Sequence, residues 1–274
     1  MSDAQGAVVG TGVGATRHRL KLALVDLSSV FHPAWHVGLS KDQGFAHVAT
    51  VARVRRAAGE ATFTAIACDS ASSFRKALSP AYKADRPAKS AALEAELKRV
   101  CATLAADGFM VARADGFEAD DVIATFVAWA RRYPDPPTVE ILSSDKDLLA
   151  LVGGPVRVRS VSSGMLFGVE EVRVKLGVPP AQVPDYLALV GDSSDGIEGV
   201  TGVGAKTAAR LLTQFGSLDA LLDRAGEVTP PGIGAAIVAA RGNGTLALAR
   251  QLIALRDDAP VDCRAVLAHR AGFG

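Results

Sequence analysis

Acidic residues recur at the carboxyl ends of apolar segments and at the starts of predicted helices in this 274-residue chain. Parallel strands bring their carboxyl ends to one edge of a sheet, so we expect these acids to gather there. Without counterions so many carboxylates would repel one another, and hard oxygen ligands of this kind bind Mg²⁺ or Mn²⁺. Two such ions suit phosphodiester hydrolysis. The nine candidate ligands are Asp26, Asp69, Glu118, Asp120, Asp121, Asp145, Asp147, Asp192 and Asp195.

Each acidic motif also has a purely structural interpretation. Acids in the first turn of a helix, as in residues 117–122, stabilise its positive end. Asp145 can cap a helix after a strand, and Asp192 can close a hydrogen-bonded turn. These alternatives do not explain why the motifs occur together with Asp26 and Asp69 at two further strand ends. The conjunction favours a metal centre that cuts nucleic acid.

Apolar runs alternate with amphipathic stretches over the first 168 residues. The alternation predicts an α/β fold with a mostly parallel sheet flanked by helices, because parallel strands need long crossover connections. The predicted strands are Leu22–Asp26, Thr64–Asp69, Phe109–Arg113, Val139–Ser143 and Val156–Val161, and the predicted helices are Phe45–Ala58, Ala91–Ala106 and Asp120–Arg132.

From residue 169 onward, helical patterns are joined by Gly-rich turns and no further strand is expected. We therefore divide the chain into a flexible tail at 1–19, an α/β core at 20–168 and an all-helical domain at 169–274. The helices predicted in that domain are Val169–Leu176, Val183–Val190, Ala205–Phe215, Leu218–Arg224, Ile233–Arg241 and Leu246–Leu255.

The helical domain contains a glycine-rich hairpin, residues 199–212. It nearly matches an ATP-binding P-loop, but one extra residue separates the last glycine from Lys206, and a helix and turn precede it instead of a strand. Gly202 and Gly204 would let the backbone approach a DNA phosphate at the start of a helix. Lys206 and Thr207 would add side-chain contacts that position a duplex without reading its sequence.

A basic segment, residues 73–89, separates the second predicted strand from the helix at 91–106. It carries five basic residues against one acid. A solvated loop is the usual meaning of such a run. Here the segment follows Asp69 closely, which places it over the proposed metals, and Tyr82 offers a ring for base stacking. We predict that it contacts nucleic acid.

Composition narrows the class of protein. The hydrophobic content of 49% supports a real core, and the net charge of +1 neither requires nor excludes a polyanionic partner. The apolar run from Leu20 is too short to cross a bilayer, so no membrane association is expected. Three scattered cysteines fit buried thiols in a reducing cytoplasm, and no zinc site is expected at His32 and His36, where Pro33 is expected to interrupt a helix.

The order of the motifs resembles the 5′→3′ exonuclease and flap endonuclease family, in particular the 5′-nuclease domain of bacterial DNA polymerase I, here as a stand-alone protein. The resemblance covers residues 20–258. It implies a PIN-like nuclease core, a helical arch at about 73–92 and a helix-three-turn-helix at about 183–216. The motifs that carry it are Val25-Asp26, Cys68-Asp69, Ser73-Phe74-Arg75, Tyr82-Lys83, Arg86-Pro87, Glu118-Ala119-Asp120-Asp121, Ser144-Asp145-Lys146-Asp147, Gly191-Asp192-Ser193-Ser194-Asp195 and the hairpin.

The resemblance also implies roles for individual residues. Asp26, Asp69, Glu118 and Asp120 match positions around one metal, and the other five acids match those around the second. Lys83 and Arg86 match basic residues that touch the scissile phosphate. Arg75 and Tyr82 match residues guiding the 5′ strand, and relatives hold K⁺ on carbonyls of the hairpin. Together with the basic segment and the hairpin, the candidate DNA contacts are Arg75, Lys76, Tyr82, Lys89, Gly202, Gly204, Lys206 and Thr207.

Several positions depart from the family pattern. Leu27 and Pro33 stand where a Gly and an Arg are common, so one expected phosphate contact is missing. Gly196 replaces a usual Asn and Glu198 a usual Pro, which adds negative charge near the DNA. The loop between Asp69 and Arg75 is one residue shorter than in polymerase-linked members.

The implied activity is metal-dependent 5′→3′ exonuclease and flap endonuclease cleavage of DNA to 5′-phosphate products, in replication and repair. Expected substrates have 5′ ends, flaps or nicks, and we expect a cytoplasmic, nucleoid-associated monomer with a separate DNA polymerase partner. Alternatives are a catalytically silent binder of DNA structures and an RNase-H-like remover of RNA primers. A ribonuclease of the related PIN type is disfavoured, because such enzymes normally lack the hairpin domain. A phosphatase of the haloacid-dehalogenase type is also disfavoured, because Asp26-Leu27-Ser28 lacks the second Asp of its nucleophile motif.

Overall fold

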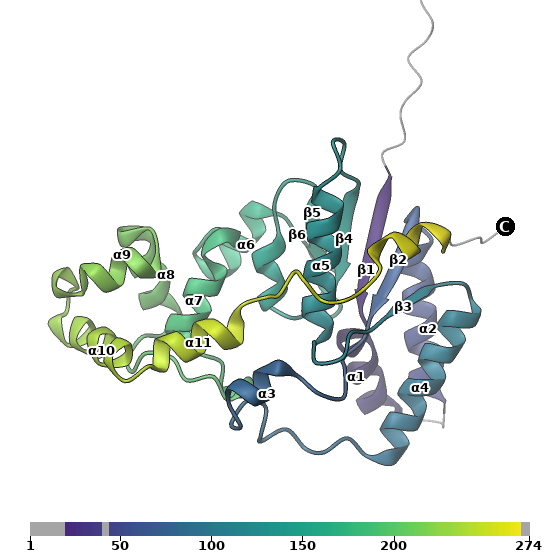
Figure 1. The fold of residues 1–274 in the computed structure, drawn as a ribbon, viewed down its shortest axis with the longest axis horizontal. Helices are drawn as coiled ribbons and strands as arrows, with labels where there is room; N and C mark the ends of the chain where they lie inside the picture. Colours follow the sequence, from purple (N-terminus) through teal and green to yellow (C-terminus); the bar gives the residue numbers. More distant parts are fainter. Residues whose placement is uncertain (1–19, 40–43, 270–274) are drawn as a thin grey trace, which may run out of the picture.

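The computed structural model describes residues 20–39 and 44–269, so the predicted tail at 1–19 lies outside the described residues. One six-stranded sheet has the order β3-β2-β1-β4-β5-β6, with β1 to β5 parallel and β6 antiparallel at the edge (Figure 1). The mostly parallel α/β sheet is therefore confirmed. The strands are β1 (Lys21–Asp26), β2 (Phe63–Ala67), β3 (Met110–Ala112), β4 (Thr138–Leu142), β5 (Val156–Arg159) and β6 (Leu166–Phe167).

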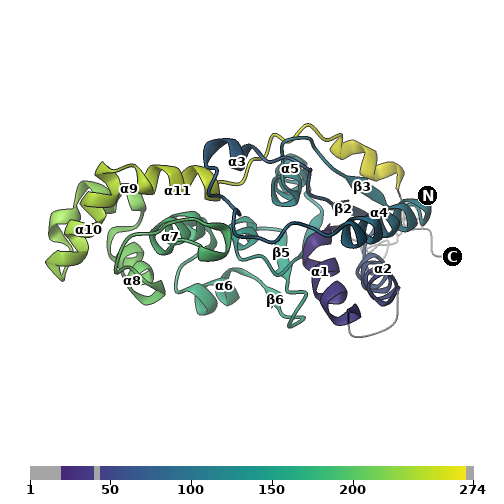
Figure 2. The ribbon, with the colours of Figure 1, turned by 90° about the horizontal axis from the view of Figure 1, so that it is seen from below.

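Helices cover both faces of the sheet because successive strand side chains point to opposite sides. Leu24 and Ile141 face the core beneath α5, whereas Val25 and Leu142 face the core beneath α1, α2 and α4. Figure 2 shows α5 on one side of the sheet and α1 and α2 on the other. The helices of this part are α1 (Leu27–Gly38), α2 (Phe45–Ala58), α3 (Phe74–Leu78), α4 (Ala91–Ala106) and α5 (Ala119–Arg131), with the 3₁₀ helix η1 (Asp147–Leu151).

Helix α1 corrects one sequence expectation, because it runs through Pro33 instead of being interrupted there. Proline removes one backbone hydrogen bond from a helix interior. Val30 and Phe31 compensate by packing into the core against the sheet, and Asp26 caps the first turn by accepting from the Ser29 amide. The burial of Val30 and Phe31 therefore outweighs the loss of one backbone hydrogen bond at Pro33.

The second half is helical, as predicted, and extends from one end of the sheet (Figure 1). Its apolar side chains belong to the same continuous core as the α5 face of the sheet, so the two parts are packed together. The elements are α6 (Val169–Leu176), η2 (Pro180–Gln182), α7 (Val183–Val190), η3 (Ser193–Asp195), α8 (Ala205–Phe215), α9 (Leu218–Asp223), η4 (Ala225–Glu227), α10 (Pro231–Gly242), α11 (Thr245–Ile253) and η5 (Cys263–Ala268).

Two segments differ from the predicted domain plan. The expected helical arch is helical only over α3, and residues 79–90 form turns and extended chain leading to α4. Residues 254–269, grouped above with the helical domain, return across the α/β part and place η5 against β2 and α5 (Figure 1). Ala259, Cys263 and Val266 are buried there, and the Ala259 amide donates to Thr125 Oγ1 at 3.0 Å.

Burial of the thiols differs from the prediction at one position. Cys68 and Cys263 are buried as expected, whereas Cys101 is only half-buried. Within the described ranges, no helix is both long and apolar enough to span a membrane.

A close crossing of backbones fixes the turn that carries Asp192 and Asp195. Gly191 and Gly199 face each other at the base of this turn, and Asp192 pairs with Ile197 in an antiparallel bridge. A Cβ atom on Gly199 would lie 2.5 Å from the Gly191 nitrogen. The two glycines therefore allow an approach that a side chain would prevent.

We predict that Gly199→Ala destabilises the protein by about 2 kcal/mol or more, since the new methyl group meets rigid backbone. Gly232→Ala is the matched control, because a Cβ there meets nothing within 4 Å. Urea unfolding measures both variants. Equal stability of the two would contradict the close crossing.

Candidate active site

The ends of three parallel strands bring acids from distant parts of the sequence together. Asp26 ends β1, while Asp69 and Asp145 follow β2 and β4 within a few residues. The charge of Asp120, in the first turn of α5, interacts with Asp26, Asp69, Asp145 and Asp147. The predicted convergence at the carboxyl edge of the sheet is therefore present in the structure.

Asp26 lies at the bottom of this cluster and is almost fully buried. Its Oδ2 accepts from Ser29 Oγ at 2.5 Å and from Ser143 Oγ at 2.7 Å. Burial raises the pKa of Asp26 to about 6 despite these hydrogen bonds, and the nearby charge of Asp69 adds to the rise. The serines hold the carboxylate in a fixed orientation.

Asp69 and Asp120 occupy contrasting environments. Burial opposes ionisation of Asp69, but hydrogen bonds from Ser28 Oγ at 2.7 Å and the Ala119 amide at 3.0 Å lower its pKa below the usual value. Burial followed by the repulsion of Asp145 and other acids raises the pKa of Asp120 well above its usual range. No cation pairs with Asp120 in the part of the chain that the structure describes.

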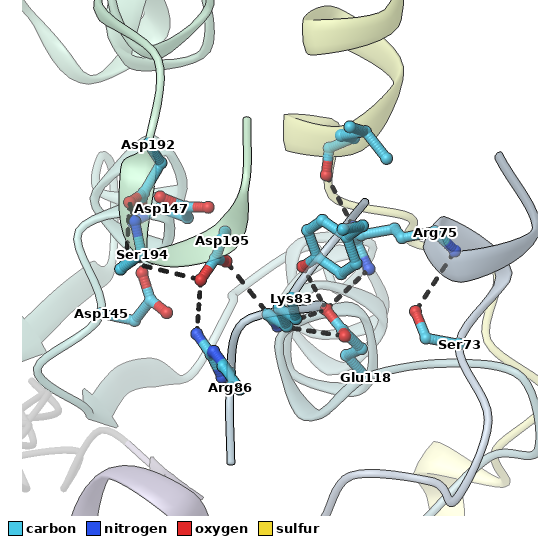
Figure 3. Close-up of polar contacts among 12 residues, drawn as sticks. Ser73, Arg75, Lys83, Arg86, Glu118, Asp145, Asp147, Asp192, Ser194 and Asp195 are labelled. Carbon is cyan, nitrogen blue, oxygen red and sulfur yellow. Dashed lines mark hydrogen bonds and ion pairs between the residues drawn. The ribbon is translucent and has the colours of Figure 1, made fainter. Parts of the chain in front are cut away.

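The second group of acids lies on two turns that face each other, as Figure 3 shows. Burial and then the charge of Asp145 raise the pKa of Asp147 to about 7, and burial raises that of Asp145. Asp192 faces them from the α7–α8 connection and pairs with Lys146 at 3.0 Å. Asp195 follows within the same connection and is buried.

Basic side chains neutralise part of this charge. Lys83 Nζ lies 3.0 Å from both carboxylate oxygens of Glu118 and 3.8 Å from Asp195 Oδ2, and Arg86 pairs directly with Asp195 (Figure 3). No three His, Cys, Asp or Glu side chains within 20–39 and 44–269 converge closely enough to hold a metal ion as they stand. Among the carboxylates that the sequence assigns to metals, Glu118, Asp192 and Asp195 thus already pair with cations of the chain itself.

The backbone of Lys83 is held in an unusual conformation, with φ at +54°. Its amide donates to the Asp195 carbonyl at 2.8 Å, and Gly196 packs so closely that a Cβ there would strike the Ala81 carbonyl. A non-glycine residue adopts positive φ only when its surroundings require it. The glycine at 196, a departure from the family pattern, allows the base of the basic segment to dock on this turn.

Asp121 faces Arg75, which also contacts Glu118, so this structure does not place Asp121 as the direct metal ligand that the sequence predicts. Its side chain is fully buried, and Arg75 binds its two oxygens at 2.7 and 2.8 Å. The same carboxylate accepts from the amides of Glu118 and Arg256. Every oxygen is engaged in this arrangement, so Asp121 ties the start of α5 to α3 and to the returning segment.

Arg75 and Tyr82 are likewise not exposed DNA contacts in this structure. Arg75 is 3% exposed and also donates to the carbonyls of Leu252 and Ala254. Tyr82 is 3% exposed, and its hydroxyl donates to Glu118 at 2.9 Å. Both side chains face inward because the acids of α5 lie there, and they position Glu118.

The remaining predicted DNA contacts lie on the surface. Lys76 and Lys89 are exposed in the basic segment, while Gly202, Gly204 and Lys206 are exposed at the start of α8, with Thr207 half-buried. No side chain caps the amino end of α8, and the space above Gly204 is open. These positions are accessible to a phosphate backbone, and their role stays a prediction.

Sequence reasoning missed several supporting residues. Ser28, Ser29 and Ser143 hold Asp26 and Asp69, Lys146 pairs with Asp192, and Arg256 lies over the rings of Phe74 and Phe117. Ser143 is the last residue of one predicted strand, and Ser28 and Ser29 lie within three residues of the end of another, which was an available signal. Arg256 lies far from Phe74 and Phe117 in the sequence, and no sequence pattern indicated this contact.

The raised pKa values of the clustered acids predict how the stability of the metal-free protein changes with pH. An acid whose pKa rises on folding binds more protons in the folded chain between its two pKa values, so stability falls as pH rises through that interval. We expect Asp147→Asn, measured by urea unfolding in EDTA, to stabilise the protein at pH 8 by about 1.4 kcal/mol or more, the value of one pKa unit. At pH 4 the effect should be small.

Asp135→Asn is the matched control, because Asp135 is exposed near the amino end of β4, away from the cluster. It should leave stability unchanged at both pH values. A destabilised Asp147→Asn protein at pH 8 would contradict the repulsion.

The buried ion pair predicts a second stability effect. Arg75→Ala leaves Asp121 charged and unpaired, so we expect a loss of about 3–5 kcal/mol in urea unfolding. Lys76→Ala, on the same helix but exposed, should change stability by less than about 0.5 kcal/mol. A mild Arg75→Ala effect would show that Asp121 finds other partners.

Comparison with known proteins places the chain in a family. Residues 21–177 match the family model for the 5′-3′ exonuclease N-terminal resolvase-like domain, and residues 178–271 match that for the 5′-3′ exonuclease C-terminal SAM fold. DNA polymerase I of Rhizobium leguminosarum is 40% identical over 194 residues, which cover 70% of this chain and 19% of that enzyme. The 5′-3′ exonuclease of Aquifex aeolicus is 39% identical over 142 residues, covering 52% and 48%.

A solved structure shares the fold. The bacteriophage T5 flap endonuclease in a pseudo-enzyme-product complex with DNA and metal ions superposes with a TM-score of 0.72 at 21% identity, covering 91% of this chain and 93% of that one. The chain spans less than half the length of the curated relatives above. Since the family models account for both the sheet with its acids and the helical part, the chain belongs to the 5′-3′ exonuclease family.

Proposed function

We propose that this protein is a metal-dependent 5′→3′ exonuclease and structure-specific flap endonuclease that cleaves DNA to 5′-phosphate products during replication and repair. The observation that carries the proposal is the convergence of strand-terminal acids at one sheet edge, directly beside Lys83 and Arg86. Such crowding costs stability, so a structural role does not explain it. Family membership gives independent support.

The carboxylate oxygens of the acid cluster are suitable ligands for divalent cations. All the ligating atoms are hard carboxylate oxygens, and burial with mutual repulsion raises the pKa of Asp120, Asp145 and Asp147, which is the electrostatic state that a cation relieves. Bound Mg²⁺ or Mn²⁺ would supply charge stabilisation at a phosphoryl oxygen and a lowered pKa for water. We assign one ion to Asp26, Asp69, Glu118 and Asp120, and a second to Asp145, Asp147, Asp192 and Asp195.

Lys83 and Arg86 would stabilise the negative charge of the scissile phosphate. In the structure they neutralise Glu118 and Asp195, so their charges already lie at the cluster before a substrate arrives. Lys83 projects from a backbone fixed by the Asp195 carbonyl, which limits the positions of its ammonium group. Cations held in place stabilise developing phosphate charge without reorganisation.

Accessible groups elsewhere would hold the DNA. The open amino end of α8, with Lys206 beside it, suits the backbone of a duplex, and K⁺ would bind to backbone carbonyls of the hairpin. Lys76 and Lys89 lie along the segment that leads to the acids. Because these contacts would reach phosphates, affinity should fall steeply with salt.

The decisive assay compares four 5′-end-labelled substrates, with Mg²⁺ or with EDTA: a DNA flap, a nicked DNA duplex, single-stranded DNA and an RNA–DNA hybrid. We predict Mg²⁺-dependent cleavage at the flap junction. An Asp145→Asn and Asp192→Asn double variant should lose at least about 10³-fold in rate, since it removes two charges around one proposed ion. Asp135→Asn is the exposed control and should cut normally.

The outcomes separate the candidate functions. Flap binding without cleavage by any variant would favour a catalytically silent binder of DNA structures. Cleavage confined to RNA in an RNA–DNA hybrid would favour primer removal of the RNase-H type. Full activity in EDTA would overturn the metal-dependent mechanism itself.

A further inference from the structure

Two thiols touch directly behind the acid cluster. Cys68 follows β2 and immediately precedes Asp69, and Cys101 lies on α4, 33 residues away. Their sulfur atoms are 3.9 Å apart. A pair of thiols at this distance can react with each other, which a lone cysteine cannot do.

The two cysteines differ in accessibility. Cys68 is 3% exposed within the core between the sheet and α4, whereas Cys101 is half-buried at its edge. A hydrogen bond from the Cys68 thiol lowers the pKa of Cys101 to about 7, and the charge of Arg113 acts in the same direction. Burial raises the pKa of Cys263, the third cysteine, to about 11. Cys101 therefore has the most thiolate character, and thiolates are the form that oxidants attack.

We propose that Cys68 and Cys101 form an oxidation site, in which peroxide converts the contacting thiols to a disulfide that displaces Asp69 and weakens cation binding at the acid cluster. The Cys101 thiolate attacks one peroxide oxygen, the O–O bond breaks, and the leaving hydroxide takes a proton to become water. The Cys68 sulfur then attacks the Cys101 sulfenic acid, the S–O bond breaks, and a second water leaves. Two thiols are oxidised and one hydrogen peroxide is reduced to two waters.

Formation of the disulfide would displace Asp69 because Asp69 is the next residue in the chain after Cys68. An S–S bond is about 2.05 Å long, so the sulfur atoms approach each other by roughly 2 Å. Cys68 is bonded to Asp69, whose carboxylate depends on the hydrogen bonds from Ser28 and Ala119. Movement of Cys68 toward α4 draws Asp69 from these partners. Disturbing the groups that orient a ligand lowers metal affinity about 10–100-fold.

Peptide mapping under non-reducing conditions tests the site on the full-length protein after peroxide treatment. We expect a linked Cys68–Cys101 peptide, two hydrogens lighter than its parts, which dithiothreitol separates. Cys101→Ser should lose the link, and the matched control Cys263→Ser should keep it. Two free thiols, a sulfinic acid at Cys101 with Cys68 still free, or a bond between two molecules would each overturn the proposal.

Titration with Mn²⁺ alone, followed by calorimetry, tests the coupling to the acids. The oxidised protein should bind Mn²⁺ about tenfold or more weakly than the reduced protein, and Cys101→Ser should be insensitive to peroxide. A disulfide that leaves the Mn²⁺ affinity unchanged would overturn the link to Asp69. This coupling rests on the proposed function. If the reduced protein bound no Mn²⁺, the proposed function and this coupling would fail together, while peptide mapping would still decide the thiol pair.

Discussion

Repulsion among buried carboxylates is the constraint on which the site depends. Parallel strands present their last residues at one edge, and this chain places Asp26, Asp69 and Asp145 there while α5 brings Asp120 toward them. Burial removes the water that would screen the charges. The fold sustains the cluster by hydrogen bonds to Asp26 and Asp69 and by ion pairs to Glu118, Asp192 and Asp195. The raised pKa values of Asp120, Asp145 and Asp147 that remain are what a bound divalent cation would lower.

The Arg75–Asp121 pair explains how distant segments hold this arrangement. It joins α3, α5 and the segment after α11, because Arg75 also donates to Leu252 and Ala254 and Asp121 accepts from the Arg256 amide. Three parts of the chain thus meet at one buried charge pair. The same junction orients Glu118, through Arg75 and Tyr82, at the edge of the acid cluster. Stability and site geometry are therefore coupled at the start of α5.

Local patterns in the sequence determined most of the architecture. Apolar periodicity located the five parallel strands to within a few residues, and the predicted helices Phe45–Ala58 and Ala91–Ala106 agree with α2 and α4. Strand-terminal position was sufficient to gather Asp26, Asp69 and Asp145, because topology alone brings the carboxyl ends of parallel strands together. The signal failed at α1, where Pro33 suggested an interruption that burial of Val30 and Phe31 overrides.

Only the tertiary structure decided which charges face the cluster and which are buried away from it. Asp120 and Asp121 are neighbours in sequence, but successive helix positions point about 100° apart, so one faces the acids and the other faces Arg75. Arg75 and Tyr82 resemble exposed contacts by composition, yet inward carboxylates bury both. The contact of Cys68 with Cys101 was equally invisible, because it depends on how α4 packs against the core on that face of the sheet. The sequence by itself determined the strands, helices and acids, since these follow from local periodicity and chain topology, whereas pairing among charges and thiols depends on distances that only packing sets.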